Sequence, residues 1–145
     1  MIPKILMTIG DPGGIGPEVL FKALANLPKQ LPFIPIIIGS KSVFEHPTLN
    51  KYISSINPIT IDAASRDSLK HLNENQVYMY HTYDLDNPFT YGKPDAISGL
   101  ASFHYLEVAT TLLASGIGDA LVTAPISKTS FNLAKIPFTG HTEWL

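Results

Sequence analysis

The fold of this chain is predicted by the stretch Met7-Thr8-Ile9-Gly10-Asp11-Pro12-Gly13-Gly14-Ile15-Gly16-Pro17-Glu18. The apolar run of residues 5–9 is typical of a buried strand, and the glycines that follow leave a turn with almost no side-chain bulk. Pro17 suits the first position of a helix, because its missing N–H would have no partner there anyway. The stretch therefore predicts a strand, a glycine turn and a helix N-terminus.

Two interpretations of this glycine turn remain open. Its N–H groups and the positive end of the helix dipole could face a phosphate, a carboxylate or a nucleotide, with Asp11, Gly13, Gly14 and Gly16 lining a cleft. Alternatively, the glycines serve only a tight turn that needs positive φ. The spacing matches neither the dinucleotide-binding GxGxxG pattern nor a Walker A loop.

Apolar segments alternate with amphipathic ones along the rest of the chain. Strands are expected at residues 33–38, 59–61, 76–81 and 120–122, the last as a buried strand. Helices are expected at residues 17–27, 99–115 and 127–134, together with a short one at 41–52 that is broken at Pro47. This alternation predicts an α/β fold with parallel strands, in which the loops 10–16, 123–128 and 140–143 lie beyond strand carboxyl ends.

The composition limits the possible classes of protein. The chain has 145 residues, 45% of them hydrophobic, a formal net charge of −2 and no cysteine. It is long enough for one domain with a real core, and it has no disulfide or thiol chemistry. Its scattered lysines and arginines predict neither nucleic-acid nor membrane-surface binding. The absence of a signal peptide or an apolar run of about 18 residues predicts a cytoplasmic protein.

Two further segments contain candidate functional residues. Lys128 follows a predicted strand end, where its ammonium could pair with a phosphate, or it could be an ordinary surface lysine after the N-cap Ser127. His141 and Thr142 could bind substrate, and a histidine there could act as an acid or base near neutral pH. The alternative is that Thr142 caps a helix, Glu143 favours its first turn and His141 is a surface residue.

The remaining histidines predict no metal site. None of the motifs that place histidines and carboxylates at metal-binding spacing is present. His104 falls within the longest predicted helix without a histidine or carboxylate four residues later, so we expect it at the edge of the core rather than as a ligand.

Three segments together resemble a known family, the 4-hydroxythreonine-4-phosphate dehydrogenases of vitamin B6 (pyridoxal phosphate) biosynthesis. They are residues 10–18 (Gly-Asp-Pro-Gly-Gly-Ile-Gly-Pro-Glu), 120–128 (Ala-Leu-Val-Thr-Ala-Pro-Ile-Ser-Lys) and 136–143 (Ile-Pro-Phe-Thr-Gly-His-Thr-Glu). Their order and spacing also fit. The first segment alone is similar to the turn of isopropylmalate dehydrogenases, whose fold this family shares.

The resemblance implies a three-layer α/β/α fold of the isocitrate/isopropylmalate dehydrogenase type, in a homodimer of two-domain subunits. It implies NAD(P)-dependent oxidation and decarboxylation of 4-phosphooxy-threonine to 3-amino-2-oxopropyl phosphate, assisted by a divalent metal ion (zinc, magnesium or cobalt). His141 and Thr142 match positions that contact substrate in the family. Lys128 is a candidate for an electrostatic role.

The chain also departs from the family pattern. Gly13 stands where alanine is more usual, and Ser127 where asparagine is common. Residues 1–145 are expected to be the N-terminal portion of a chain about twice as long, inactive by itself, with the metal ligands beyond residue 145. Two alternatives remain: a paralogous dehydrogenase of another phosphorylated hydroxy acid, and an inactive fragment that binds an anion.

Overall fold

Five parallel strands form one sheet through the middle of the computed structural model, which describes residues 1–85 and 88–145. The strands lie in the order β3-β4-β2-β1-β5. Their bounds are β1 Lys4–Thr8, β2 Ile34–Gly39, β3 Ile59–Asp62, β4 Tyr78–His81 and β5 Ala120–Thr123. Because every pair is parallel, all five carboxyl ends lie at the same edge of the sheet.

β2 lies at the centre of this sheet because its side chains are apolar on both faces. All six of its residues are buried, and its β-branched run pairs with β1 on one side and β4 on the other. A strand covered by helices on both faces is continuously hydrophobic rather than alternating. The expected alternation of strands and helices, and the parallel sheet, are confirmed.

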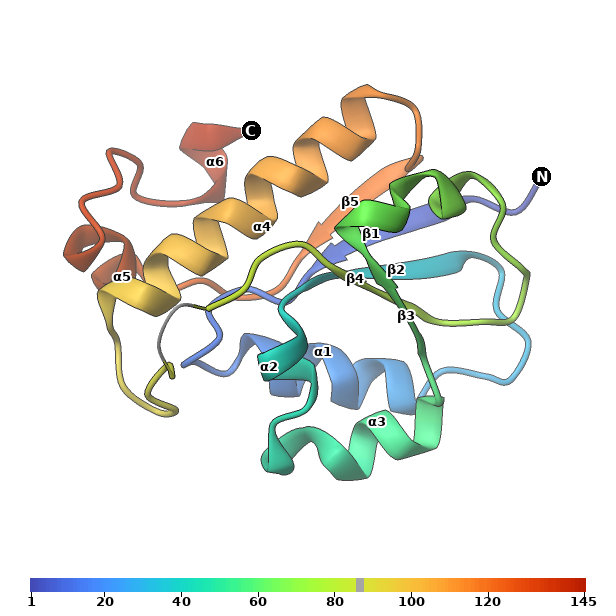
Figure 1. The fold of residues 1–145 in the computed structure, drawn as a ribbon, viewed down its shortest axis with the longest axis horizontal. Helices are drawn as coiled ribbons and strands as arrows, with labels where there is room; N and C mark the ends of the chain where they lie inside the picture. Colours follow the sequence, from blue (N-terminus) through green and yellow to red (C-terminus); the bar gives the residue numbers. More distant parts are fainter. Residues whose placement is uncertain (86–87) are drawn as a thin grey trace.

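Helices cover both faces of the sheet (Figure 1). One face carries α1 (Gly16–Ala25), α2 (Lys41–Phe44) and α3 (Asn50–Ile56), with a short 3₁₀ turn at Pro47–Leu49. The other face carries α4 (Ala96–Ala114), α5 (Lys128–Leu133), α6 (His141–Trp144) and the 3₁₀ segment η2 (Ala63–Lys70). The expected three-layer α/β/α fold is therefore confirmed. Among the described residues, no helix has the length and apolar character needed to cross a bilayer.

Two of the helix boundaries predicted from the sequence are confirmed, and one lies earlier in the chain than predicted. Ser127 caps α5 as expected, since its hydroxyl accepts a hydrogen bond from the Ser130 N–H at 3.1 Å. The break at Pro47 is also confirmed. α4 begins at Ala96 rather than at residue 99, because the Asp95 carboxylate accepts from the Ser98 N–H at 2.6 Å and so caps the helix earlier.

The expectation of a buried strand at residues 120–122 is wrong. β5 is the last strand of the sheet, and its side chains are exposed or half-buried, with Val122 47% exposed. Its apolar sequence suits a strand with neighbours on both sides, but β1 is its only neighbour among the described residues. Burial of a strand depends on its place in the sheet, which its own sequence does not specify.

Candidate functional site

The glycine turn is organised around the buried carboxylate of Asp11. This residue is only 2% exposed. Its Oδ1 accepts a hydrogen bond from the Gly13 N–H at 2.8 Å, and its Oδ2 accepts from the Ser130 hydroxyl at 2.7 Å. Asp11 thereby joins the turn after β1 to α5, which lies 119 residues further along the chain.

This arrangement differs from an open anion cradle. The Gly13 N–H is bound to the Asp11 carboxylate, the Gly14 N–H to the Asp11 carbonyl and the Asp11 N–H to the Pro125 carbonyl. Three N–H groups of the turn are thus satisfied within the protein, and the negative charge beside them is the chain's own. The expectation that these N–H groups are free for a ligand is wrong for Asp11, Gly13 and Gly14.

The turn nevertheless forms one wall of a cavity of about 310 Å³. Asp11, Gly13 and Gly14 line it on one side, and residues 91–94 lie on another. Ser127 and Lys93 supply a hydroxyl and a cation. Three of the four predicted cleft residues therefore border a space that a small ring or a short polar group could occupy.

Gly16, the fourth predicted cleft residue, serves close packing instead of lining this cavity. It is buried at the start of α1, and an added Cβ would lie 2.4 Å from the Ile9 carbonyl oxygen and 2.8 Å from that of Pro125. Gly10 also meets the Pro125 carbonyl closely and has a φ of +72°. These two glycines let β1, α1 and the segment after β5 approach one another.

A second cavity, of about 440 Å³, brings the other predicted residues together. Lys128, His141 and Thr142 all line it, along with Ile126 and Glu143. This cavity and the first one are lined by neighbouring residues of the segment after β5, Ser127 for the first and Ile126 and Lys128 for the second. The polar loop after β5 therefore borders both the loop after β1 and residues 140–143.

An aromatic cluster places this last loop against α4. The Trp144 ring lies 4.9 Å from the Phe103 ring and 5.1 Å from the Phe138 ring, both edge to face. Phe103 in turn contacts Phe131 of α5, with 6.1 Å between ring centroids. Such ring pairs stabilise beyond the area that they bury. The cluster holds α5 and α6 on one helix, so that His141 and Lys128 face the same space.

His141 lines this second cavity, and its imidazole is partly buried. Its Nε2 is buried and makes no hydrogen bond with any described residue. Burial lowers the pKa of His141 below its usual value. The imidazole is thus uncharged near neutral pH, and its Nε2 has neither a hydrogen-bond partner among the described residues nor contact with solvent.

The loop before α6 is held by Glu143, a feature that the sequence reasoning missed. Its carboxylate accepts from the Thr139 N–H at 2.8 Å and from the Thr139 hydroxyl at 2.6 Å. These hydrogen bonds from Thr139 lower the pKa of Glu143. α6 begins after Gly140 without a side-chain cap, so the interpretation of Thr142 as a helix cap is wrong. The sequence signal was a threonine and a glutamate four residues apart around a glycine.

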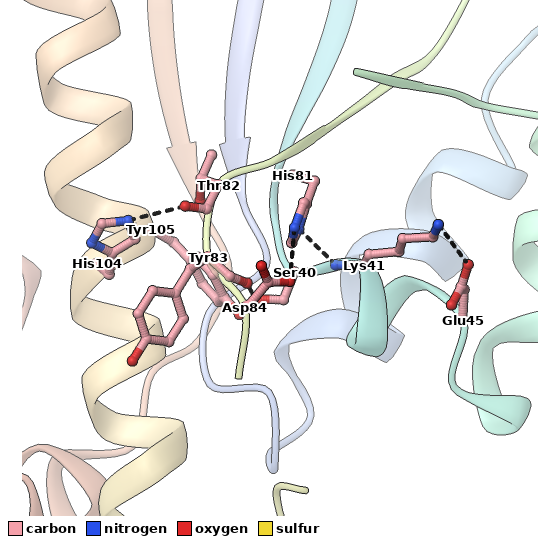
Figure 2. Close-up of polar contacts among 9 residues, drawn as sticks. All are labelled: Ser40, Lys41, Glu45, His81, Thr82, Tyr83, Asp84, His104 and Tyr105. Carbon is pink, nitrogen blue, oxygen red and sulfur yellow. Dashed lines mark hydrogen bonds and ion pairs between the residues drawn. The ribbon is translucent and has the colours of Figure 1, made fainter. Parts of the chain in front are cut away.

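A further polar cluster lies at the carboxyl ends of β2 and β4 (Figure 2). The Ser40 hydroxyl is bound to the Tyr83 carbonyl and to the Tyr105 hydroxyl. His81 accepts from the Lys41 N–H at 3.0 Å through Nδ1, and its Nε2 lies 3.1 Å from the Asp84 carboxylate. Burial raises the pKa of Tyr105, so its hydroxyl stays protonated. The sequence reasoning missed this cluster, because Ser40 is bound to residues 43 and 65 positions away and Lys41 to one 40 positions away.

The described residues do not offer a metal site. Within residues 1–85 and 88–145, no three histidine, aspartate or glutamate side chains come together where they could hold an ion. His141 would supply at most one imidazole, whereas protein zinc sites use three or four ligands.

Sequence comparison identifies the relatives of this chain. Residues 33–145 match the family described as Pyridoxal phosphate biosynthetic protein PdxA. The 4-hydroxythreonine-4-phosphate dehydrogenase of Synechocystis is 35% identical over 144 residues, which are 99% of this chain and 38% of that protein. A Symbiobacterium thermophilum protein, provisionally named D-threonate 4-phosphate dehydrogenase, is 33% identical over 97% of this chain and 41% of its own length.

Solved structures agree with these relatives. Two 4-hydroxythreonine-4-phosphate dehydrogenases, from Burkholderia phymatum and Klebsiella pneumoniae, each superpose with a TM-score of 0.75 at 26% identity. Each match covers 99% of this chain and 42% of the solved one, so the chain spans about two fifths of the length of its relatives. With its three motifs, its parallel sheet and this match over most of its length, the chain belongs to the pyridoxal phosphate biosynthetic protein PdxA family.

Proposed function

We propose that this chain forms part of the active site of a dehydrogenase that oxidises and decarboxylates 4-phosphooxy-threonine to 3-amino-2-oxopropyl phosphate. The observation that carries the proposal is the convergence of Lys128, His141 and Thr142 on one cavity. The names of the relatives supply the reaction class. A homodimer and a cytoplasmic location remain predictions from the family resemblance and the sequence.

The cavity supplies groups suited to a phosphorylated amino acid. The Lys128 ammonium offers a positive charge to the phosphate or the carboxylate. The His141 imidazole and the Thr142 hydroxyl can each form a hydrogen bond with a substrate oxygen. The contacts of Trp144 and Glu143 hold these groups before a ligand enters, which lowers the entropic cost of binding.

The cavity beside the glycine turn is proposed for one end of NAD(P). When bound, this cofactor accepts the hydride from the carbon that bears the substrate hydroxyl. A space of about 310 Å³ fits one ring of the dinucleotide but not all of it. Gly13 and Gly14 add no side chains to its wall, and Ser127 of this cavity is next in sequence to Ile126 and Lys128, which line the cavity beside His141. The metal ligands implied by the family resemblance would lie outside these 145 residues.

Substitution of His141 tests the proposed function. The chain, joined to the remaining portion of the Klebsiella pneumoniae dehydrogenase, is assayed for reduction of NAD(P) with 4-phosphooxy-threonine. We expect His141→Ala to lower kcat/KM by more than about tenfold, because a group bound to the reacting substrate is lost. His71→Ala, an exposed histidine that lines neither cavity, is the control. A near-wild-type value for His141→Ala would remove His141 from the site.

Binding to the chain itself provides a second measurement that does not depend on the chimera. Titration with 4-phosphooxy-threonine is followed through the NMR signals of Ile126 and His141. Saturable shifts that disappear in Lys128→Gln support the proposed site. Shifts spread over the surface without saturation would contradict it. The chain alone is expected to show no turnover.

A paralogous reaction is the second candidate function. A relative of similar identity is provisionally named for D-threonate 4-phosphate, which has a hydroxyl where phosphooxy-threonine has an amino group. The cavity around His141 contains a glutamate, Glu143, but both of its oxygens already accept from Thr139. Comparison of kcat/KM for the two substrates in the same chimera discriminates between these functions.

A further inference from the structure

A third cavity, of about 360 Å³, lies between η2, β4 and α4. Its volume is within the range of small-molecule sites, roughly 300–1,000 Å³. None of its residues lines the cavities beside Gly13 or His141. Its lining includes Arg66, Tyr80, His104, Glu107, Val108 and Leu112.

Tyr80 of β4 contributes a phenol to the lining of this cavity. Tyr80 is only 3% exposed, yet its side chain lines the cavity. Its hydroxyl makes no hydrogen bond with any residue that the structure describes. Burial raises the pKa of Tyr80 more than the nearby Arg66 lowers it, so the hydroxyl stays protonated. The protonated hydroxyl at the cavity is a donor that a ligand or water can satisfy.

One end of the cavity is positively charged. The Arg66 guanidinium makes a single long hydrogen bond, 3.3 Å to the Ser115 hydroxyl, among the described residues. Most of its five donors are therefore free for a planar acceptor such as a carboxylate. Arg66 and the Tyr80 hydroxyl together form a donor set for an anionic group.

The other end accepts hydrogen bonds. His104 lies against the end of β4, with its Nε2 at 3.3 Å from the Thr82 carbonyl (Figure 2). When Nε2 carries the proton and donates there, Nδ1 is an acceptor that faces the Glu107 carboxylate at 3.9 Å. Two acceptors then face each other, and an ammonium group between them could donate to both.

The two ends are well separated. Arg66 is bonded to Ser115, whereas Glu107 lies eight residues earlier on α4, about 12 Å along the helix at ~1.5 Å per residue. Val108 and Leu112 line the cavity from the same helix. A ligand that reaches both ends would carry its charges several carbons apart, with an apolar chain between them.

We propose that this cavity binds a linear zwitterion, an amino acid whose carboxylate and ammonium are separated by several methylene groups. The carboxylate lies on Arg66 and Tyr80, the ammonium on Glu107 and His104, and the apolar chain on Val108 and Leu112. This site goes beyond the proposed dehydrogenase function and shares no residue with it.

The probe is 6-aminohexanoate, titrated into the chain while the methyl NMR signals of Val108 and Leu112 are followed. Hexanoate and hexylamine each keep only one charged end. We expect 6-aminohexanoate to bind at least about tenfold more tightly than either, because each loses one charge-assisted contact. No saturable shift, or equal binding of hexanoate, would overturn the proposal.

Two substitutions test which end of the cavity binds the carboxylate of the ligand and which binds its ammonium group. Arg66→Gln is expected to weaken 6-aminohexanoate and hexanoate about tenfold and to leave hexylamine unchanged. Glu107→Gln should weaken 6-aminohexanoate and hexylamine and leave hexanoate unchanged. Lys70→Gln is the control, since Lys70 is on η2 but pairs with Asp67 at the surface. If Arg66→Gln unfolds the chain, Glu107→Gln still decides, because an unchanged affinity for 6-aminohexanoate contradicts the proposal.

Discussion

Asp11 shows how one side chain changes the meaning of a motif. In the sequence it precedes a glycine turn that is typical of anion binding. In the structure its carboxylate accepts hydrogen bonds from the Gly13 N–H of that turn and from the Ser130 hydroxyl. The turn is therefore closed by an internal anion, and Asp11 acts first as a structural residue.

Removal of this carboxylate should destabilise the protein. Asp11→Ala leaves the Gly13 N–H and the Ser130 hydroxyl without their acceptor, and a buried unsatisfied group costs about 1–3 kcal/mol. We expect the free energy of unfolding, measured with urea, to fall by at least about 2 kcal/mol. Asp67→Ala is the control, because its ion pair is exposed and should contribute little. Equal losses in the two variants would contradict this role.

His141 should titrate at a lower pH in the folded chain than in the urea-unfolded chain. Burial disfavours its charged form, so its folded pKa is the lower of the two. The unfolded state then binds more protons, and stability is lost as the pH falls through the unfolded and then the folded pKa. NMR titration of the imidazole in both states measures the shift. A higher folded pKa would indicate an anionic partner that the structure does not show.

At the scale of elements, α4 organises the second half of the chain. It packs on β1, β2 and β5 and contacts α5 at Gly99. Its Phe103 belongs to the aromatic cluster that contacts α6. An added Cβ on Gly99 would lie 2.1 Å from the Ser130 carbonyl oxygen, so the two helices cross closely. Because α5 and α6 both pack against α4, the position of α4 determines where the cavity beside His141 forms.

The cap of α4 offers a test at this scale. The Asp95 carboxylate accepts from the Ser98 and Thr90 N–H groups, so Asp95→Ala should cost about 1 kcal/mol of unfolding free energy, within a range of ~0.5–2. Burial raises the pKa of Asp95, but these hydrogen bonds outweigh it and the net pKa is lowered. The stabilisation is thus present above the unfolded pKa and is lost as the pH falls through the folded one.

Urea unfolding of wild type and Asp95→Ala at neutral and acidic pH measures this difference. Asp95→Asn is the matched variant, because an amide oxygen also caps a helix N-terminus. We expect it to retain most of the stability at neutral pH. A difference between wild type and Asp95→Ala that persists unchanged in acid would contradict the assignment of the cap.

For the whole molecule, the notable feature is the edge of the sheet at β5, which pairs only with β1 among the residues that the structure describes. The Ala124 N–H bonds to the Thr8 carbonyl, so alternate backbone groups of β5 point away from β1. Val122, 47% exposed, adds an apolar side chain to this edge. Unpaired edges of this kind favour association with another chain, and a charged side chain opposes it.

We expect the chain to associate as its concentration rises and Val122→Lys to reduce that association. Sedimentation velocity over a range of concentrations measures the effect. Leu133→Lys, another exposed apolar position but on α5, is the control and should have a smaller effect. Equal effects of the two substitutions would show that general hydrophobicity, not the β5 edge, drives association.

The order of strands and helices could be predicted from local pattern, because period, caps and turns are properties of neighbouring residues. The β-branched run of β2, the break at Pro47 and the Ser127 cap are examples. The motif residues Lys128, His141 and Thr142 were also identified from the sequence, although their roles remain predictions.

The sequence by itself determined an α/β chain with parallel strands and with polar loops at the carboxyl ends of those strands. Local apolar periodicity and turn chemistry dictate these features. Only the tertiary structure decided that β5 lies at an edge, that Asp11 closes its own turn and that Arg66 and Glu107 share a cavity. These features depend on contacts between residues separated by tens of positions. Such contacts arise from the packing of the whole chain and leave no trace in any short stretch of it.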